Sequence, residues 1–205
     1  DFKGMRKKMF FVFLAVGVLA CAGLAVTPMT GFAENTGVAE VVGTAILNQT
    51  LSQFGESDTA YNLLLQRGNP SWLYSIDQGA TTIWERWDSY TKEKGFGPVS
   101  MNSFNHYSLG SVLSWLYHTG LGIQRDETKP GYQHILLKPQ PGPLEFMKGS
   151  VDSPYGVISA GWERKGDKIE YQVTIPVNTT ATLFKNTQDP ADTVELGSGT
   201  YTFML

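Results

Sequence analysis

The sequence predicts an α+β protein of two folded parts, in which helices come first and an antiparallel β-sandwich follows. From about Gly37 to Ile123 the apolar residues recur at helical spacing, whereas after Thr128 apolar and polar residues alternate as they do in strands. A hairpin signal, Lys165-Gly166-Asp167-Lys168, separates two of the alternating runs. A run of helices followed by a run of strands is typical of α+β or multidomain chains.

Residues 1–33 have the features of a leader and a signal peptide. Met5-Arg6-Lys7-Lys8 carries positive charge, and an almost uninterrupted apolar run follows from Met9 to Val26. Gly31-Phe32-Ala33 then offers small residues at the two positions that a signal peptidase reads. We therefore expect an exported protein, secreted or periplasmic, whose mature chain starts at Glu34, and mass spectrometry of the secreted product would test that start.

Two other interpretations of this segment remain open. The apolar run over residues 9–26 is close to the length that spans a bilayer, so a retained membrane anchor is one alternative. Val18-Leu19-Ala20-Cys21 approximates a bacterial lipoprotein site, although Leu19 is not the usual residue there, and a lipid anchor on Cys21 is the other. Cys21 is the only cysteine, so cleavage after Ala33 leaves no disulfide, no thiol chemistry and no cysteine-based zinc site.

Charge argues against nucleic acid as a partner. Four of the 16 basic residues and one of the 19 acidic residues lie before Glu34, which leaves 12 basic and 18 acidic residues in the remainder. Binding to phosphates needs a basic patch, and this remainder does not supply one. The balance is that of a protein acting on a neutral substrate, and no motif indicates a metal or another cofactor.

We assign residues 34–127 to the helical part, where three segments are expected to be helices. Gly55-Glu56-Ser57-Asp58 separates the first two, and Ser57 or Asp58 is available to cap the second. The third is expected from Ser108 to Gly120. The apolar residues at helical spacing are Val38, Val41, Val42, Ala45 and Ile46 in the first segment, Tyr61, Leu64 and Leu65 in the second, and Leu109, Val112, Leu113, Leu116 and Tyr117 in the third.

We assign residues 128–205 to the β-sandwich, with a boundary near Asp126 to Pro130. Pro139-Gln140-Pro141-Gly142-Pro143 cannot belong to a helix or a central strand, so it ends the first expected strand. Strands are expected at His134–Lys138, Val157–Glu163, Ile169–Ile175, Ala181–Phe184 and Thr200–Leu205.

Aromatic and polar residues concentrate between Asn69 and Tyr117, where four of the five tryptophans lie. Sugars stack their C–H faces on aromatic rings and pair their hydroxyls with carboxylates, amides and imidazoles. Charged residues beside tryptophan suit such a site better than a core, because burial of an unpaired charge is unfavourable. A purely structural aromatic cluster is the alternative, since Trp84 and Trp87 lie at helical i,i+3 spacing.

Three blocks in this window resemble signature motifs of the inverting bacterial α-L-rhamnosidases. They are Asn69-Pro70-Ser71-Trp72-Leu73-Tyr74, Gln78-Gly79-Ala80-Thr81-Thr82-Ile83-Trp84-Glu85-Arg86-Trp87-Asp88 and Met101-Asn102-Ser103-Phe104-Asn105-His106-Tyr107. The resemblance continues in order from about Gly37 to Phe184. Further matching blocks are Pro130-Gly131-Tyr132, Lys138-Pro139-Gln140-Pro141, Ser153-Pro154-Tyr155-Gly156 and Pro176-Val177-Asn178-Thr179-Thr180-Ala181.

The resemblance implies part of an α/α toroid of the six-hairpin type, followed by a C-terminal β-sandwich. It implies hydrolysis of terminal α-L-rhamnosides with inversion, in which Glu85 is the general base. Trp84 and Trp87 would shape the pocket, and His106 would lie at the sugar. The partner it implies is a rhamnose-containing glycoside or oligosaccharide. Inversion also needs a second, protonated carboxyl about 6.5–9.5 Å from the base.

The chain departs from the family pattern in one respect, which leaves three functions open. The acidic motifs that the family carries in the first half of its toroid, including the general acid, are absent. The chain is therefore expected to be inactive alone, or to work with a complementary chain that supplies the missing half. The third possibility is a non-catalytic carbohydrate-binding or surface protein.

Overall fold

The computed structural model describes residues 37–186 and 189–205, with side chains at residue 43 and from residue 46 onward. The predicted signal, its cleavage site and the anchors at residues 9–26 lie outside these residues. The chain divides into two compact units, Asp1–Val112 and Leu113–Leu205. Within the described part, no helix has both the length and the apolar character needed to cross a bilayer.

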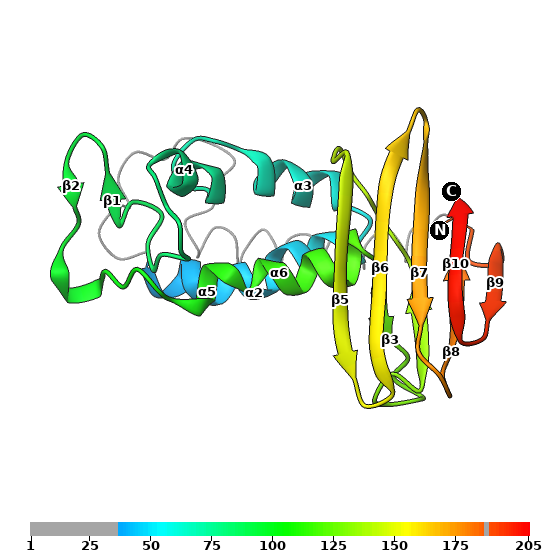
Figure 1. Ribbon diagram of the computed structural model, residues 1–205. Helices are drawn as coiled ribbons and strands as arrows, with labels where there is room; N and C mark the ends of the chain where they lie inside the picture. The colour runs from blue at the N-terminus through cyan, green and yellow to red at the C-terminus, as the bar shows by residue number, and fades with distance from the viewer. Residues whose placement is uncertain (1–36, 187–188) are drawn as a thin grey trace, which may run out of the picture. The chain divides into compact units, whose positions relative to one another are not determined.

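The first unit is built on the helices α2 (Gly37–Gln53), α3 (Ser57–Leu65) and α4 (Trp72–Asp77). In Figure 1, α3 and α2 run alongside one another, and α2 also contacts the short helix α5 (Tyr107–Gly110). Asn48 of α2 is buried and its Nδ2 donates to the carbonyl of Ala60 in α3, at 3.4 Å. The first two predicted helices are therefore present and packed against each other.

The predicted cap of α3 is wrong. The helix begins at Ser57, and the capping position is occupied by Glu56, whose side chain makes no capping hydrogen bond. Thr59 Oγ1 instead donates to the Glu56 carboxylate at 3.4 Å. By contrast, Ser71 caps α4, because its Oγ accepts from the backbone N–H of Tyr74 at 3.0 Å.

The third predicted helix is present as three short pieces. The α-helices α5 and α6 (Val112–Trp115) are followed by a π-helical turn η2 (Leu116–Gly120). The pieces together cover the predicted Ser108–Gly120. The boundary that we placed near Asp126 to Pro130 stays a prediction.

The second unit is a sandwich of two four-stranded sheets (Figure 1), with strand orders β10-β7-β6-β5 and β3-β4-β8-β9. Its core is one continuous apolar cluster with members from both sheets, including Ile135, Ile158, Trp162, Tyr171 and Leu183. The strands are β3 (Ile123–Arg125), β4 (His134–Leu137), β5 (Phe146–Ser153), β6 (Gly156–Lys165), β7 (Lys168–Ile175), β8 (Thr180–Phe184), β9 (Thr193–Leu196) and β10 (Gly199–Met204).

All five predicted strands are found, and the predicted hairpin joins β6 to β7. Three strands of the second unit were not predicted: β3, β5 and β9. The short antiparallel pair β1 (Tyr90–Thr91) and β2 (Gly95–Phe96) of the first unit was not predicted either. The strand β5 contains Lys148-Gly149-Ser150, which lowers its strand propensity, but each of its residues pairs with one of β6. Tertiary pairing therefore overrides a weak local preference here.

One strand pair departs from the antiparallel arrangement, because β4 and β8 are parallel. The buried imidazole of His134 bridges them, with Nδ1 2.6 Å from Thr180 Oγ1 and Nε2 2.9 Å from Thr182 Oγ1. Thr182 Oγ1 donates in turn to Glu195 of β9 at 2.6 Å. His134 therefore has a structural role, as it satisfies both ring nitrogens inside the sheet.

Two buried aromatic residues anchor the chain before β3 to the opposite sheet. Trp162 Nε1 donates to the carbonyl of Gly120 at 2.9 Å, and Tyr171 Oη donates to the carbonyl of Leu121 at 3.1 Å. Both carbonyls belong to the segment in which the helical pieces end. The sandwich core thus holds that segment in place through two direct, buried hydrogen bonds.

We expect Tyr171 to make the protein sensitive to alkali. Burial raises the pKa of its phenol above the ordinary value of 10.0. The phenol therefore ionises at a lower pH in the unfolded chain than in the folded chain. As a result, the free energy of unfolding falls as the pH rises above about 10, by about 1.4 kcal/mol per pH unit for one such group. Urea unfolding from about pH 9 to about pH 11.5 checks this. Tyr171→Phe should flatten the decline, and an unchanged slope in this variant would contradict the assignment.

Candidate functional site

The candidate site lies where two irregular segments of the first unit run side by side. The backbone N–H of Glu85 donates to the carbonyl of Ser103 at 2.8 Å, and that of His106 donates to the carbonyl of Ile83 at 2.8 Å. The hydroxyl of Thr82 adds a hydrogen bond to the carbonyl of Phe104. Neither segment is helical, and these contacts bring two of the predicted site residues, Glu85 and His106, onto paired segments.

The Glu85 carboxylate is held in place by a backbone donor. The N–H of Ser103 donates to Glu85 Oε2 at 2.7 Å, which completes a reciprocal pair of hydrogen bonds between these two residues. The other oxygen, Oε1, accepts no hydrogen bond from the described residues, and the side chain is half-buried. A carboxylate with one oxygen fixed and the other available can accept a proton from water.

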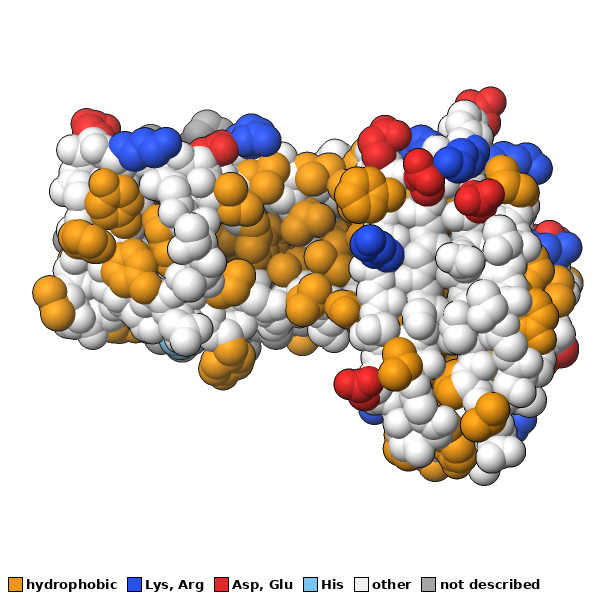
Figure 2. All heavy atoms as spheres, in the orientation of Figure 1, with side chains coloured by type: hydrophobic (Ala, Val, Ile, Leu, Met, Phe, Trp, Pro, Cys, Tyr) orange, Lys and Arg blue, Asp and Glu red, His pale blue; other side chains and the backbone are white. Residues whose placement is uncertain are grey.

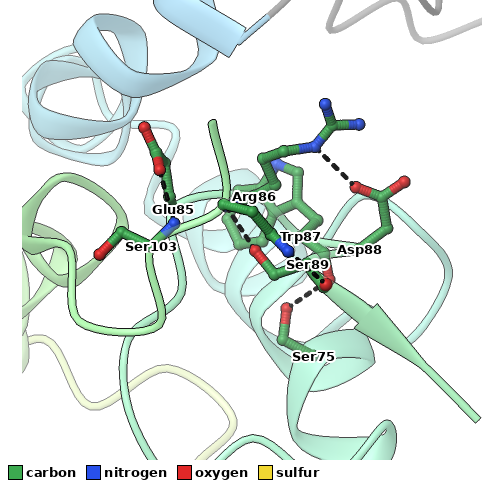
Figure 3. Close-up of polar contacts among 8 residues, drawn as sticks. Ser75, Glu85, Arg86, Trp87, Asp88, Ser89 and Ser103 are labelled. Carbon is green, nitrogen blue, oxygen red and sulfur yellow. Dashed lines mark hydrogen bonds and ion pairs between the residues drawn. The ribbon is translucent and has the colours of Figure 1, made fainter. Parts of the chain in front are cut away.

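Asp88 is not a partner of Glu85. Figure 3 shows the Glu85 carboxylate beside Ser103 on one side and Asp88 beside Arg86 on the other. Arg86 Nε donates to Asp88 Oδ1 at 3.2 Å, and both side chains are about 40% exposed. The carboxylate of Asp88 is thus occupied with a surface ion pair.

A buried serine organises the turn that follows Glu85. Ser89 Oγ accepts from the N–H of Arg86 at 3.2 Å. The carbonyl of Ser89 accepts from Gly97 N at 2.9 Å and from Asn102 Nδ2 at 3.0 Å. Asn102 therefore fixes the loop beside Ser103. The predictions missed both Ser89 and the Ser103 N–H, since backbone contacts across a loop have no signal in the residue pattern.

Trp84 is part of an aromatic cluster. It is buried, with 6% of its surface exposed, and it meets Phe104 edge-on at a centroid distance of 5.4 Å and Tyr90 at 6.5 Å. Phe96 extends the cluster through contacts at 5.2 Å to Tyr90 and 5.6 Å to Phe104. Trp84 thus supports the strand-like pairing that carries Glu85, and a direct contact with substrate stays a prediction.

Trp87 packs in a different place. Its ring meets Trp72 edge-on at 5.0 Å, and both line a narrow apolar crevice with Leu47 and Leu63. Trp72 Nε1 donates to the carbonyl of Leu109 at 2.8 Å. The segment from Trp84 to Trp87 is a bend and a turn, so the helical interpretation of their i,i+3 spacing is wrong. Its role in shaping a sugar pocket stays a prediction.

The hydrogen bonds of His106 select one tautomer. Its Nδ1 accepts from the N–H of Ser108 at 3.4 Å, which caps α5, and its ring stacks on Tyr107 at 5.3 Å with an interplanar angle of 13°. An accepting Nδ1 carries no proton, so the proton of the neutral ring is on Nε2. The Nε2–H of this half-buried residue can therefore donate to a hydroxyl oxygen.

No metal centre is found in the part of the chain that the structure describes. Among these residues, no three His, Cys, Asp or Glu side chains gather closely enough to hold an ion.

Two domain families match the chain one after the other. Residues 24–119 match the family model described as the bacterial alpha-L-rhamnosidase 6 hairpin glycosidase domain, and residues 122–198 match the bacterial alpha-L-rhamnosidase C-terminal domain. The first match begins at residue 24, earlier than Gly37, where the resemblance of the motifs begins. The two models meet near η2 and β3.

Curated relatives and solved structures agree with these matches. An alpha-L-rhamnosidase of Formosa agariphila is 43% identical over 143 residues, which cover 69% of this chain and 15% of the relative. The crystal structure of Streptomyces avermitilis alpha-L-rhamnosidase complexed with L-rhamnose matches with a TM-score of 0.72 and 35% identity, over 80% of this chain and 18% of that one. The Aspergillus terreus enzyme matches with a TM-score of 0.75 and 32% identity, over 93% of this chain and 24% of that one.

The matches also show how much of a relative is represented. The chain spans about 15% of the length of the curated relatives that it matches. That share carries the matches to both domain models. The motifs around Glu85, the fold of each unit and the order of the two domains together show that this chain belongs to the bacterial α-L-rhamnosidase family of glycoside hydrolases.

Proposed function

We propose that this chain supplies the base-bearing part of an active site that hydrolyses terminal α-L-rhamnosides with inversion. The observation that carries the proposal is the Glu85 carboxylate, which is oriented by the Ser103 N–H through Oε2 and has Oε1 available. In an inverting hydrolase, one carboxylate removes a proton from the water that attacks the sugar. Glu85 is the group with this role.

The other proposed site residues act on the sugar. His106 donates from Nε2 to a rhamnose hydroxyl, because its Nδ1 is engaged by Ser108. Trp84 and Trp87 are proposed to shape the sugar pocket from two separate aromatic clusters, in which each is supported by a second aromatic ring. The complex of the Streptomyces relative with L-rhamnose supports rhamnose as the sugar.

In this proposal the general acid is neither of the two aspartates of the window, because both are engaged in ion pairs. Asp77 and Asp88 are paired with Arg67 at 2.7 Å and Arg86 at 3.2 Å. An inverting site needs its two carboxyl groups on opposite faces of the sugar, with room for water. We therefore propose that these 205 residues alone do not hydrolyse natural rhamnosides, and that a complementary polypeptide carrying the acid completes the site.

A chimera tests the proposal. The matched region of the Streptomyces avermitilis enzyme, which is 36% identical over 181 residues, is replaced by the corresponding residues of this chain. The chimera should hydrolyse an aryl α-L-rhamnoside, and ¹H NMR should detect the β-anomer of rhamnose as the first product. This chain alone should show no turnover under the same conditions. A folded chimera without activity, or an α-anomer as the first product, would overturn the proposal.

A further inference from the structure

The outward face of the sheet β10-β7-β6-β5 carries a row of hydroxyl groups. Ser150 pairs with Ser159, Ser159 with Thr174, and Thr174 with Thr200, so each strand contributes one hydroxyl in register. Adjacent strands lie about 4.8 Å apart, so the row repeats at that spacing across the sheet. Thr174 Oγ1 and Thr200 Oγ1 are hydrogen-bonded at 3.0 Å.

The next row is formed by Lys148, Gly161, Gln172 and Thr202, in the same strand order. Gly161 has no side chain, so the sheet surface is lower at this point than at its neighbours. The members of these rows on β5, β6 and β7 line a hollow of about 360 Å³, whereas Thr200 and Thr202 of β10 do not. The lining residues from the two rows are Lys148, Ser150, Ser159, Gly161, Gln172 and Thr174.

Charge on this face is concentrated away from the hollow. The next row towards the β6–β7 hairpin contains Glu163 and Glu170, which pair with each other across the two strands. The hairpin residues Lys165 and Lys168 lie next to them. In Figure 2 the middle of the sheet is mostly white, which marks backbone and side chains that are neither charged nor hydrophobic, and most charged side chains lie towards its edges. Apart from Lys148, every residue that lines the hollow is uncharged.

The hollow also has an aromatic neighbour. Phe146 stands two residues before Lys148 on the same face of β5, and 66% of its surface is exposed. Phe146 does not line the hollow itself, but it is an exposed aromatic residue on the same strand face. Aromatic rings bind the C–H faces of sugars, while hydroxyls and amides pair with sugar hydroxyls.

We propose that this hollow is a binding site for a neutral saccharide, separate from the residues around Glu85. Serine and threonine hydroxyls both donate and accept hydrogen bonds, and Gln172 adds an amide, so they match the hydroxyls of a sugar without requiring charge. A phosphate or a sulfate is disfavoured because only one cationic side chain faces the hollow. The site uses none of the groups of the proposed rhamnosidase site, so either can exist without the other.

The test is an NMR titration of the full chain with a neutral rhamnosyl-glucose disaccharide. Shifts should appear at the amides of Ser159, Gly161 and Thr174, with millimolar affinity. The double variant Ser159→Ala/Thr174→Val should weaken binding roughly tenfold, because two hydrogen-bonding groups are removed. Thr202→Val is the matched control, since it removes a hydroxyl from the same face but not from the lining of the hollow, and it should bind as the wild type does.

Each outcome decides the proposal. Shifts on β6 and β7 that persist in Glu85→Gln and weaken in the double variant support it. Shifts confined to residues near Glu85 and His106 overturn it. The absence of shifts at about 20 mM sugar also overturns it, because the dissociation constant would then be too high for a functional site. Preferential binding of a sulfated disaccharide would overturn the neutral class. A β-type circular dichroism spectrum of the double variant confirms that a loss of binding does not come from unfolding.

Discussion

Replacement of Glu85 by glutamine in the active chimera is expected to lower kcat by about 10²–10⁴-fold. The amide can still accept the hydrogen bond from the Ser103 N–H, so the loop geometry and the KM should change little. It cannot remove a proton from water. The effect therefore isolates general-base catalysis from positioning, and it is measured as the initial rate on an aryl rhamnoside.

A second carboxylate in the same segment provides a control for this test. Asp88→Asn is the matched control, because it removes a nearby carboxylate that only pairs with Arg86 on the surface. Its rate should remain close to that of the unmodified chimera. A Glu85→Gln chimera within tenfold of that rate would show that another group is the base.

The substitution Gly122→Ala is expected to destabilise the second unit by more than about 4 kcal/mol, an exceptional effect for one methyl group. Gly122 has a φ of +77°, and a Cβ at this position would lie 2.2 Å from Pro139 N and 2.4 Å from the carbonyl carbon of Lys138. Both are backbone atoms, and Lys138 N donates to the carbonyl of Gly122 at 2.9 Å, so neither strand end can move without loss of pairing. The expected result is a β-sandwich that unfolds at a much lower urea concentration than that of the wild type.

Gly166→Ala separates the clash from the conformational strain. Gly166 has a similar φ of +66° in the β6–β7 turn, but a Cβ there would have no neighbour within 4 Å. Only the left-handed conformation is penalised, by roughly 1–2 kcal/mol. Urea unfolding of both variants, followed by circular dichroism, gives the comparison. Equal losses of stability in the two variants would contradict the steric explanation.

Patterns within a short stretch of sequence predicted much of the second unit. Alternation over residues 157–163 and 169–175, with Gly166-Asp167 between them, predicted β6, β7 and their turn, because strand pairing across a two-residue turn is a local event. The strand β3 was assigned to the helical part, since three residues are too few for a period to show. The parallel pairing of β4 with β8 joins residues more than 40 positions apart, and no local pattern specifies it.

The site residues divide in the same way. The motif around Glu85 was sufficient to identify the family and the candidate base from the sequence alone, because its unusual residue types occur in a fixed order. What the motif could not decide was how the carboxylate is held. Only the tertiary structure showed the Ser103 N–H on Oε2, Trp84 and Trp87 in separate aromatic clusters, and Ser89 at the centre of the turn. Apart from the local hydrogen bond of Ser89 to Arg86, these contacts join segments more than ten residues apart in the chain, and their geometry exists only once those segments have packed.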